Sequence, residues 1–191
     1  MQFDDTASGY LTGQLLVAMP RLNDPRFERS VIYVCVHNAD GAMGLVVNRL
    51  ADEMTFPDLL GQLGIEAGPA PIALPVHVGG PVESGRGFVL HTSDYRQGST
   101  IQVNDQVSLT ATIDILRDIA EGSGPRQALL ALGYAGWGAG QLDGEMQQNS
   151  WLTVAPDETL IFDRDLAHKW ERSIAKLGVD VALLSGEAGH A

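Results

Sequence analysis

The sequence predicts a single α+β domain with a mixed, largely antiparallel sheet and flanking helices. Short strand-like runs outnumber the helical ones, and the two kinds do not alternate regularly, which argues against a doubly wound parallel sheet. A chain of 191 residues, of which 45% are hydrophobic, is long enough to build one sizeable core. No internal repeat or low-complexity linker divides the chain. We therefore expect one domain over residues 1–184 and a loose tail over residues 185–191.

Strand-like runs fill the beginning of the chain. Residues 13–20 are typical of a strand that ends at proline, and residues 30–37 form the most strongly β-branched run. The Asp40-Gly41 pair supplies the positive φ of a tight turn, so it predicts a hairpin whose second strand covers residues 42–48. We expect this hairpin at the centre of the sheet.

The middle of the chain predicts two helices and several short strands. Thr55 caps the first helix, over residues 55–63, and the second covers residues 113–121 and ends at Gly122. The apolar face of the second helix comprises Ile113, Leu116, Ile119 and Ala120. The expected strands are 76–79, 87–92, 101–103 and 107–109.

The last third begins with an apolar strand over residues 128–132, which we expect to lead into a glycine-rich turn and a short helix. The later strand-like runs are 151–154, 160–162 and 179–184. The last helix is predicted over residues 166–177. Its apolar stripe comprises Leu166, Trp170, Ile174 and Leu177.

The charge and the composition exclude several classes of protein. A formal net charge of −12 repels nucleic-acid phosphates, so direct nucleic-acid binding is not expected. Lys169, Arg172 and Lys176 share one predicted helix face, which we interpret as a solvated mixed-charge surface. No apolar run approaches the roughly 20 residues of a membrane span. The single cysteine and the absence of a basic leader predict a cytoplasmic protein.

The segment 133–145 carries the densest functional signal. Gly136, Gly138 and Gly140 surround Trp137 after a strand and before a helix, a layout that presents backbone N–H groups to an anion. The alternative interpretation is a tight turn with Trp137 packed on the core. The segment fails G-x-G-x-x-G at Gln141 and lacks the Gly-Lys-Ser/Thr of a phosphate loop, so we favour the structural interpretation.

Other residues are weaker candidates for the same site. Gln141 and Glu145 lie one helical turn apart, and Glu145 is interpreted either as a base or ligand contact or, preferably, as a surface carboxylate. Gly79 and Gly80 form a second glycine loop or a sharp strand exit. We expect Asn48 to lie near these glycine loops and to belong to the same site.

No catalytic set, metal site or cofactor is predicted. His37, His77 and His91 fall on strands or strand ends, and they form a site only if the fold brings them together. No H-E-x-x-H motif is present. Cys35 lies in the most apolar strand and is interpreted as an inert buried thiol. No serine stands in a G-x-S-x-G elbow.

Several segments, in order, resemble the YqgE/AlgH family over nearly the whole chain. They are Gly13-Gln-Leu-Leu-Val-Ala-Met-Pro20, Phe27-Glu-Arg-Ser-Val-Ile-Tyr33, Gly41-Ala-Met-Gly-Leu-Val-Val-Asn48, Gly79-Gly-Pro-Val82, Arg86-Gly-Phe-Val-Leu-His91, and Gly133-Tyr-Ala-Gly-Trp137 with Gly140-Gln-Leu142, Glu145, Asn149 and Trp151. The resemblance implies a bacterial cytosolic protein with a strongly curved mixed sheet, for which a barrel-like closure is one alternative. It supplies no catalytic residue, and some family members carry a transcriptional-regulator label.

The sequence leads to three hypotheses for the function of this protein. The first is a non-catalytic cytosolic domain that binds a small anionic ligand, such as a nucleotide, or a protein partner. Its expected site comprises Asn48, Gly79, Gly80, Gly136, Trp137, Gly138, Gly140, Gln141 and Glu145. The second is a transcriptional regulator that acts mainly through a protein partner. The third is an enzyme that uses Glu145 or a histidine as its base.

Overall fold

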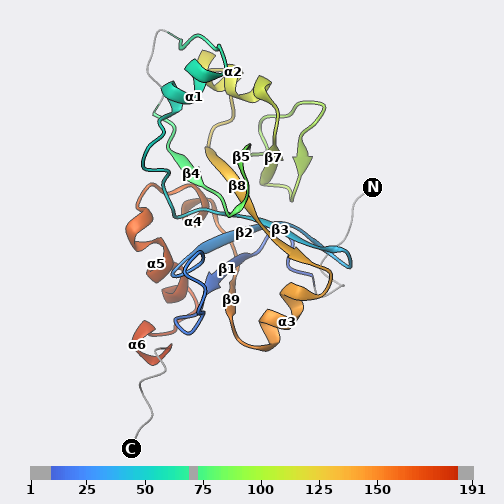
Figure 1. Cartoon of the computed structure of the whole chain (residues 1–191), viewed down its shortest axis with the longest axis vertical. Coiled ribbons are helices and arrows are strands. Elements are labelled where there is room, and N and C mark those ends of the chain that lie inside the picture. Colours follow the sequence, from blue (N-terminus) through green and yellow to red (C-terminus); the bar gives the residue numbers. More distant parts are fainter. Residues whose placement is uncertain (1–9, 69–72, 185–191) are drawn as a thin grey trace, which may run out of the picture.

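The computed structural model describes residues 10–68 and 73–184, and it confirms a single α+β domain around a strongly curled half-barrel sheet (Figure 1). The described strands follow the order β6-β7-β5-β8-β3-β2-β1-β9, and β4 pairs with β8 beside this path. Neighbouring strands are antiparallel except for the parallel β4–β8 pair. The strands are β1 (Leu15–Ala18), β2 (Val31–Asn38), β3 (Gly41–Val46), β4 (Val76–Val78), β5 (Val82–Thr92), β6 (Ile101–Gln102), β7 (Val107–Thr110), β8 (Ala128–Gly138) and β9 (Trp151–Val154).

Six α-helices and one short 3-10 turn are assigned in the described part of the chain. They are α1 (Phe56–Gln62), α2 (Ile113–Glu121), α3 (Gln141–Gln147), α4 (Glu158–Phe162), η2 (Leu166–His168), α5 (Lys169–Ala175) and α6 (Val181–Leu184). Figure 1 shows α1 and α2 at one end of the molecule, α3 near the far end of β8, and α4 and α5 beside β1. No helix among these residues is long and apolar enough to cross a bilayer.

Strand β8 joins the two halves of the curled sheet. Its first half lies between β5 and β4, and its last four residues pair with β3. Apolar side chains fill both faces of the sheet. One cluster lies inside the curl and includes Tyr33, Phe88 and Ile174, a second lies under α3, and a third lies under α1 and α2.

Local signals in the sequence placed several elements well. The hairpin of β2 and β3 lies in the middle of the strand order, as predicted. Thr55 caps α1 in a capping box with Asp58, because each side chain bonds the backbone N–H of the other residue. Helix α2 has the predicted bounds, but Ile113 is 46% exposed. Ile115 is fully buried instead, so the predicted face was shifted.

Two strand predictions for the C-terminal third were wrong, and the predicted last helix was confirmed in part. The run 160–162, predicted as a strand, lies in α4, because the Asp157 side chain accepts the N–H of Leu160 and starts a helix there. The predicted strand 179–184 contains the short helix α6. The helix predicted over 166–177 divides into η2 and α5, and Leu177 is 41% exposed. The expected tail over residues 185–191 lies outside the described residues.

The glycine-rich segment is mostly strand, which corrects the expected turn after residue 132. Strand β8 continues through Gly138, and only Ala139 and Gly140 form a turn before α3. Gly140 has a φ of 72° and is the residue before the helix.

Candidate functional site

An open groove of about 670 Å³ lies at the mouth of the half-barrel, and we call it the mouth groove. The strands β2, β3, β5, β6, β7 and β8 all contribute to its lining, so the curl of the sheet itself creates it. The apolar side chains that line it are Val36, Met43, Val82, Phe88, Ile101, Leu109 and Tyr134. Gly136 and Trp137 also line the groove, whereas most of the other expected site residues do not.

A β-bulge in β2 directs Val36 into the mouth groove. Val34 pairs with Gly44 and Val36 pairs with Met43, so Cys35 is the extra residue on this strand. Before the bulge the odd-numbered residues of β2, such as Tyr33, face the inside of the curl. After it Val36 faces inward and His37 faces α3, where its Nε2 atom lies 3.6 Å from a carboxylate oxygen of Asp143. Bulges commonly re-aim side chains next to functional sites.

Two apolar side chains of the groove lining are more exposed to solvent than the core residues around them. Ile101 is 55% exposed and Val36 is 37% exposed. Two charged residues, Arg86 and Asp40, also line the groove. The Arg86 guanidinium lies 5.1 Å from the centre of the Phe88 ring and forms a loose, exposed ion pair of 3.4 Å with Glu83. The groove is therefore an apolar surface with a charge of each sign on its lining.

The glycines of the expected site divide into two kinds. A Cβ atom at Gly79 would lie 2.3 Å from the carbonyl oxygen of Gly133, and one at Gly80 would lie 2.1 Å from the backbone of Tyr134. These glycines let the chain between β4 and β5 cross β8 in direct backbone contact. Gly136 has no positive φ, and the nearest atom to a Cβ there is a Tyr134 ring carbon at 3.3 Å. The backbone conformation therefore does not call for glycine at position 136, and an added Cβ would need the Tyr134 ring to move by a few tenths of an ångström.

Gln141, Glu145 and two tryptophans form a hydrogen-bonded cluster next to the end of β8. The indole N–H groups of Trp137 and Trp151 both donate to Oε2 of Glu145, each at 2.8 Å. Gln141 donates to Oε1 of Glu145 at 3.2 Å, and its own Oε1 accepts the backbone N–H of Gly138. The predicted common orientation of Gln141 and Glu145 is thus present, and the carboxylate holds α3 against β8 and β9.

The structure gives little support to the anion-binding layout that the glycines suggested. The N–H of Gly138 already donates to Gln141, and α3 is only seven residues long. Asn48 is also not part of this region. Its side chain accepts from the N–H of Val31 and donates to the carbonyl of Arg29, so it ties the end of β3 to the start of β2.

The fold does not bring the three strand histidines together as metal ligands. No group of three or more potential metal-binding side chains occurs in the described residues. His91 is fully buried between the carbonyl of Thr92 and the hydroxyl of Thr110, each at 2.8 Å. Burial lowers the pKa of His77 to about 4. Burial also raises the pKa of Cys35 to about 12, which fits the predicted inert thiol.

Lys169 is completely buried, so the predicted solvated face of Lys169, Arg172 and Lys176 was wrong. Its ammonium nitrogen donates to the carbonyls of Val47 at 3.0 Å and Ile161 at 2.9 Å. Burial lowers the pKa of this lysine to about 8. Its side chain fastens the C-terminal helices to the sheet, and its charge is not available to a partner.

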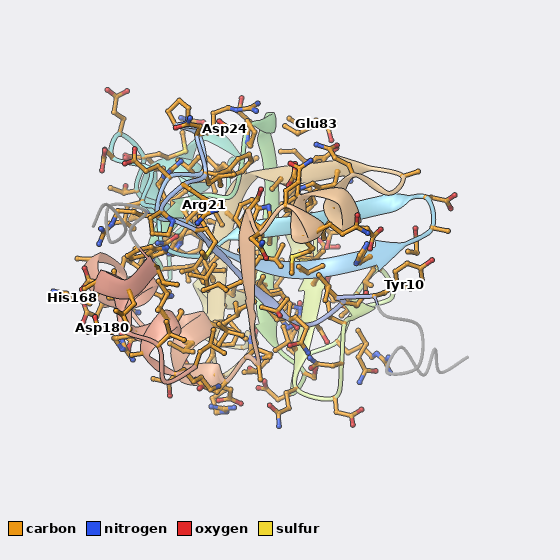
Figure 2. All side chains as sticks on the ribbon, turned by 90° about the horizontal axis from the view of Figure 1, so that it is seen from below. Tyr10, Arg21, Asp24, Glu83, His168 and Asp180 are labelled. Atoms are coloured by element: carbon orange, nitrogen blue, oxygen red, sulfur yellow. The ribbon has the colours of Figure 1, made fainter. Side chains whose placement is uncertain are left out.

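Sequence reasoning missed most of the mouth groove. Val36, Met43, Arg86 and Ile101 come from four strands, and no motif links them along the chain. The sequence held one usable signal for the groove. Glycine weakens a strand when the backbone conformation does not call for it, so a glycine within a strand marks a candidate site. Figure 2 shows Tyr10 beside the hairpin end of the molecule and His168 and Asp180 on the opposite side.

The curled sheet and its open mouth define the class of the molecule, a single-domain α+β protein with a half-barrel sheet. The family model described as AlgH-like matches residues 15–182, and the chain belongs to this family. The resemblance to YqgE/AlgH proteins seen in the sequence is thereby confirmed.

Named relatives support the same assignment. The UPF0301 protein of Rhodospirillum rubrum is 57% identical over 183 residues, which cover 96% of this chain and 95% of that protein. The UPF0301 protein of Bradyrhizobium diazoefficiens is 54% identical over 194 residues, with 97% of this chain and 91% of that protein covered.

Two solved structures are similar to this one. The solution structure of the AlgH protein from Pseudomonas aeruginosa has a TM-score of 0.78 and 39% sequence identity, and the match covers both chains completely. A crystal structure from Corynebacterium diphtheriae has a TM-score of 0.72 at 18% identity and covers 92% of this chain and 91% of that one. The second similarity concerns the fold alone.

Proposed function

We propose that this protein is a non-catalytic binding domain and that the mouth groove holds an apolar stretch of a partner protein. The observation that carries the proposal is Gly136. It lines the groove at a strand position with no positive φ, where an added Cβ would meet the ring of Tyr134 at 3.3 Å and no backbone atom within 4 Å is among its nearest neighbours. A glycine in a strand weakens the strand by roughly 0.5–1 kcal/mol relative to alanine, and such glycines often mark the close approach of a ligand or another backbone.

The lining supports a protein segment over the small anion that the sequence also suggested. The side chains around the groove are predominantly apolar, and its one cationic lining residue, Arg86, already lies next to Glu83 and the Phe88 ring. The net charge of −12 favours a partner with basic residues beside its apolar stretch. A regulator that acts through a protein partner would use the same surface, and the charge disfavours direct contact with DNA.

The proposal is tested by two-dimensional NMR with two sets of probes. One set is a pool of nucleotides and anionic metabolites, and the other is a library of capped peptides that combine apolar residues with lysine. We expect the peptides to shift the amides of Met43, Ile101 and Gly136, and the anions to leave them in place. Shifts from the anion pool alone, centred on Gly138 and Gln141, would return the site to the glycine-rich turn and overturn the proposal.

A matched pair of variants locates the binding surface. Ile101→Glu places a carboxylate in the groove, and Ile113→Glu places one on an exposed isoleucine of α2 outside it. Both side chains are about half exposed, so both variants are expected to fold. Peptide binding should weaken by about tenfold or more in the first variant, a change of about 1.4 kcal/mol. Equal weakening in both variants would exclude the mouth groove as the site.

A further inference from the structure

Strand β8 has a free edge in the mouth groove. Its pairing with β5 ends at Val82 and Tyr134, whereas residues 135–138 pair with β3. Because β5 and β3 lie on opposite sides of β8, residues 135–138 have a strand neighbour on one side only among the described strands. No other strand in residues 10–68 and 73–184 pairs with this side of β8.

Two hydrogen bonds show which backbone groups point to the free side. The N–H of Val46 donates to Gly79 on the β8 side of β3, so the even-numbered residues of β3 direct their backbone groups that way. Ala42 then bonds Trp137, and the Met43–Gly136 pair is left without mutual hydrogen bonds. The N–H of Gly138 donates to Gln141 and not to β3, which fits the same alternation. The N–H and C=O of Gly136 therefore point away from β3.

The neighbouring strand leaves room along this edge. The register of β5 shifts between Val82 and Gly87, and Glu83 within this shift has a φ of 46°, the left-handed region that a glutamate seldom adopts. The irregular segment includes Arg86, which also lines the groove. Glu83 lies at the surface in Figure 2. The bulged part of β5 thus does not continue the ladder along β8.

We infer that the mouth groove binds its partner as an added β-strand, which pairs with the backbone of Gly136 along the free edge of β8. This inference rests on the proposed function and names its mode of recognition. An exposed strand edge recognises a peptide backbone, and the side chains of the added strand alternate between the groove and solvent. Side chains that point inward meet the apolar lining around Phe88 and Leu109.

The chemistry of the edge fits one short partner strand. Gly136 adds no side chain to the groove beside its outward-pointing backbone groups, so another backbone can approach it directly. The stretch of β8 that pairs with β3 alone among the described strands is only four residues long. A short edge limits uncontrolled pairing between molecules, while the apolar lining adds affinity for a segment with the right side chains.

Backbone methylation of the peptide tests this inference without changing the protein. A capped peptide of about eight residues, a common strand length, is first selected from the library that combines apolar residues with lysine. It is then made in two forms that are N-methylated at alternate positions, so that each form loses the donors of one edge only. We expect one form to bind about tenfold more weakly or worse and the other to keep its affinity. Gly136→Val, with Gly144→Ala on α3 as the control, should weaken binding of the unmodified peptide in the same way.

The outcomes separate the inference from the proposed function. One outcome is that the peptide shifts the groove amides and that both methylated forms bind equally well. This result would overturn strand addition and leave the groove as the binding site. Peptides that bind elsewhere, or no binding peptide in the library, would overturn both. A methylation effect on one edge together with shifts at Gly136 and Met43 supports strand addition.

Discussion

The indole N–H groups of Trp137 and Trp151 converge on one oxygen of Glu145, each at 2.8 Å. The two rings come from β8 and β9, and the carboxylate comes from the helix between them. A residue that the sequence presented as a possible base is thus the acceptor that joins three elements. Its carboxylate is already committed to two indole donors and Gln141.

Removal of this acceptor should destabilise the protein. Glu145→Ala leaves two indole donors unpaired in a half-buried site, and each unsatisfied donor costs about 1–3 kcal/mol. We expect the free energy of unfolding, measured by urea denaturation, to fall by about 2–4 kcal/mol. Glu145→Gln keeps an oxygen acceptor and should lose less. If the alanine variant were as stable as the wild type, the cluster would not contribute to stability.

The glycines should separate into required and replaceable positions. A Cβ at Gly80 would lie 2.1 Å from the Tyr134 backbone, whereas the nearest contact at Gly136 is 3.3 Å to a ring carbon of Tyr134. We expect Gly80→Ala to lower the melting temperature by several degrees or to prevent folding. Gly136→Ala should change the free energy of unfolding by less than about 1 kcal/mol. Equal damage from both substitutions would show that the fold itself requires glycine at 136.

Acid should weaken the fold through His77. Its pKa in the folded protein is about 4, below the ordinary value of 6.5, because burial disfavours the charged ring and the nearby Lys169 adds to the effect. Between these two values the unfolded chain takes up a proton that the folded chain excludes, so stability falls as the pH drops from 6.5 to 4. The loss is at most about 3 kcal/mol. Urea denaturation of the wild type and His77→Gln across this range should show a smaller slope in the variant.

The lowered pKa of Lys169 should likewise make stability rise with pH, but in the alkaline range. Burial holds its pKa at about 8, below 10.5, so the folded state prefers the neutral amine, which still has two N–H donors for the carbonyls of Val47 and Ile161. Its contribution to stability should rise as the pH increases from 8 toward 10.5, by at most about 3 kcal/mol.

The buried Cys35 opposes this trend, because its raised pKa lets only the unfolded chain ionise above pH 9. The informative quantity is therefore the difference between the wild type and Lys169→Met, measured by urea denaturation at pH 7.5 and 9.5. A difference that does not change with pH would show that Lys169 is protonated in the fold throughout.

Elements with local signals were predictable from the sequence, and those that depend on distant contacts were not. The turn over residues 38–41 and the Thr55 cap depend on their immediate neighbours, and both were found. The run at Leu160 is too short for its period to separate a helix from a strand, and the Asp157 cap decided it. Lys169 looked like a surface residue because its acceptor at Val47 lies 122 residues away.

The site was harder to predict than the fold. Gly136 and Trp137 were found as candidates because glycine and tryptophan are conspicuous, and they lie at the groove. Val36 and Ile101 were missed because the bulge at Cys35 and the curl of the sheet bring them to the groove. A bulge within an unbroken apolar run leaves no mark in the sequence, since the residues on both sides suit a regular strand equally well.

The position of β8 has a consequence for the order in which the protein folds. Its residues 128–138 are the shared neighbour of β3, β4 and β5, and β1 gains its second neighbour only when β9 is present. During synthesis the early hairpin therefore gains its neighbour on the β3 side only when a strand encoded about ninety residues later is available. We expect such long-range pairing to slow folding, and a chain truncated before Gly138 lacks part of the strand that pairs with β3.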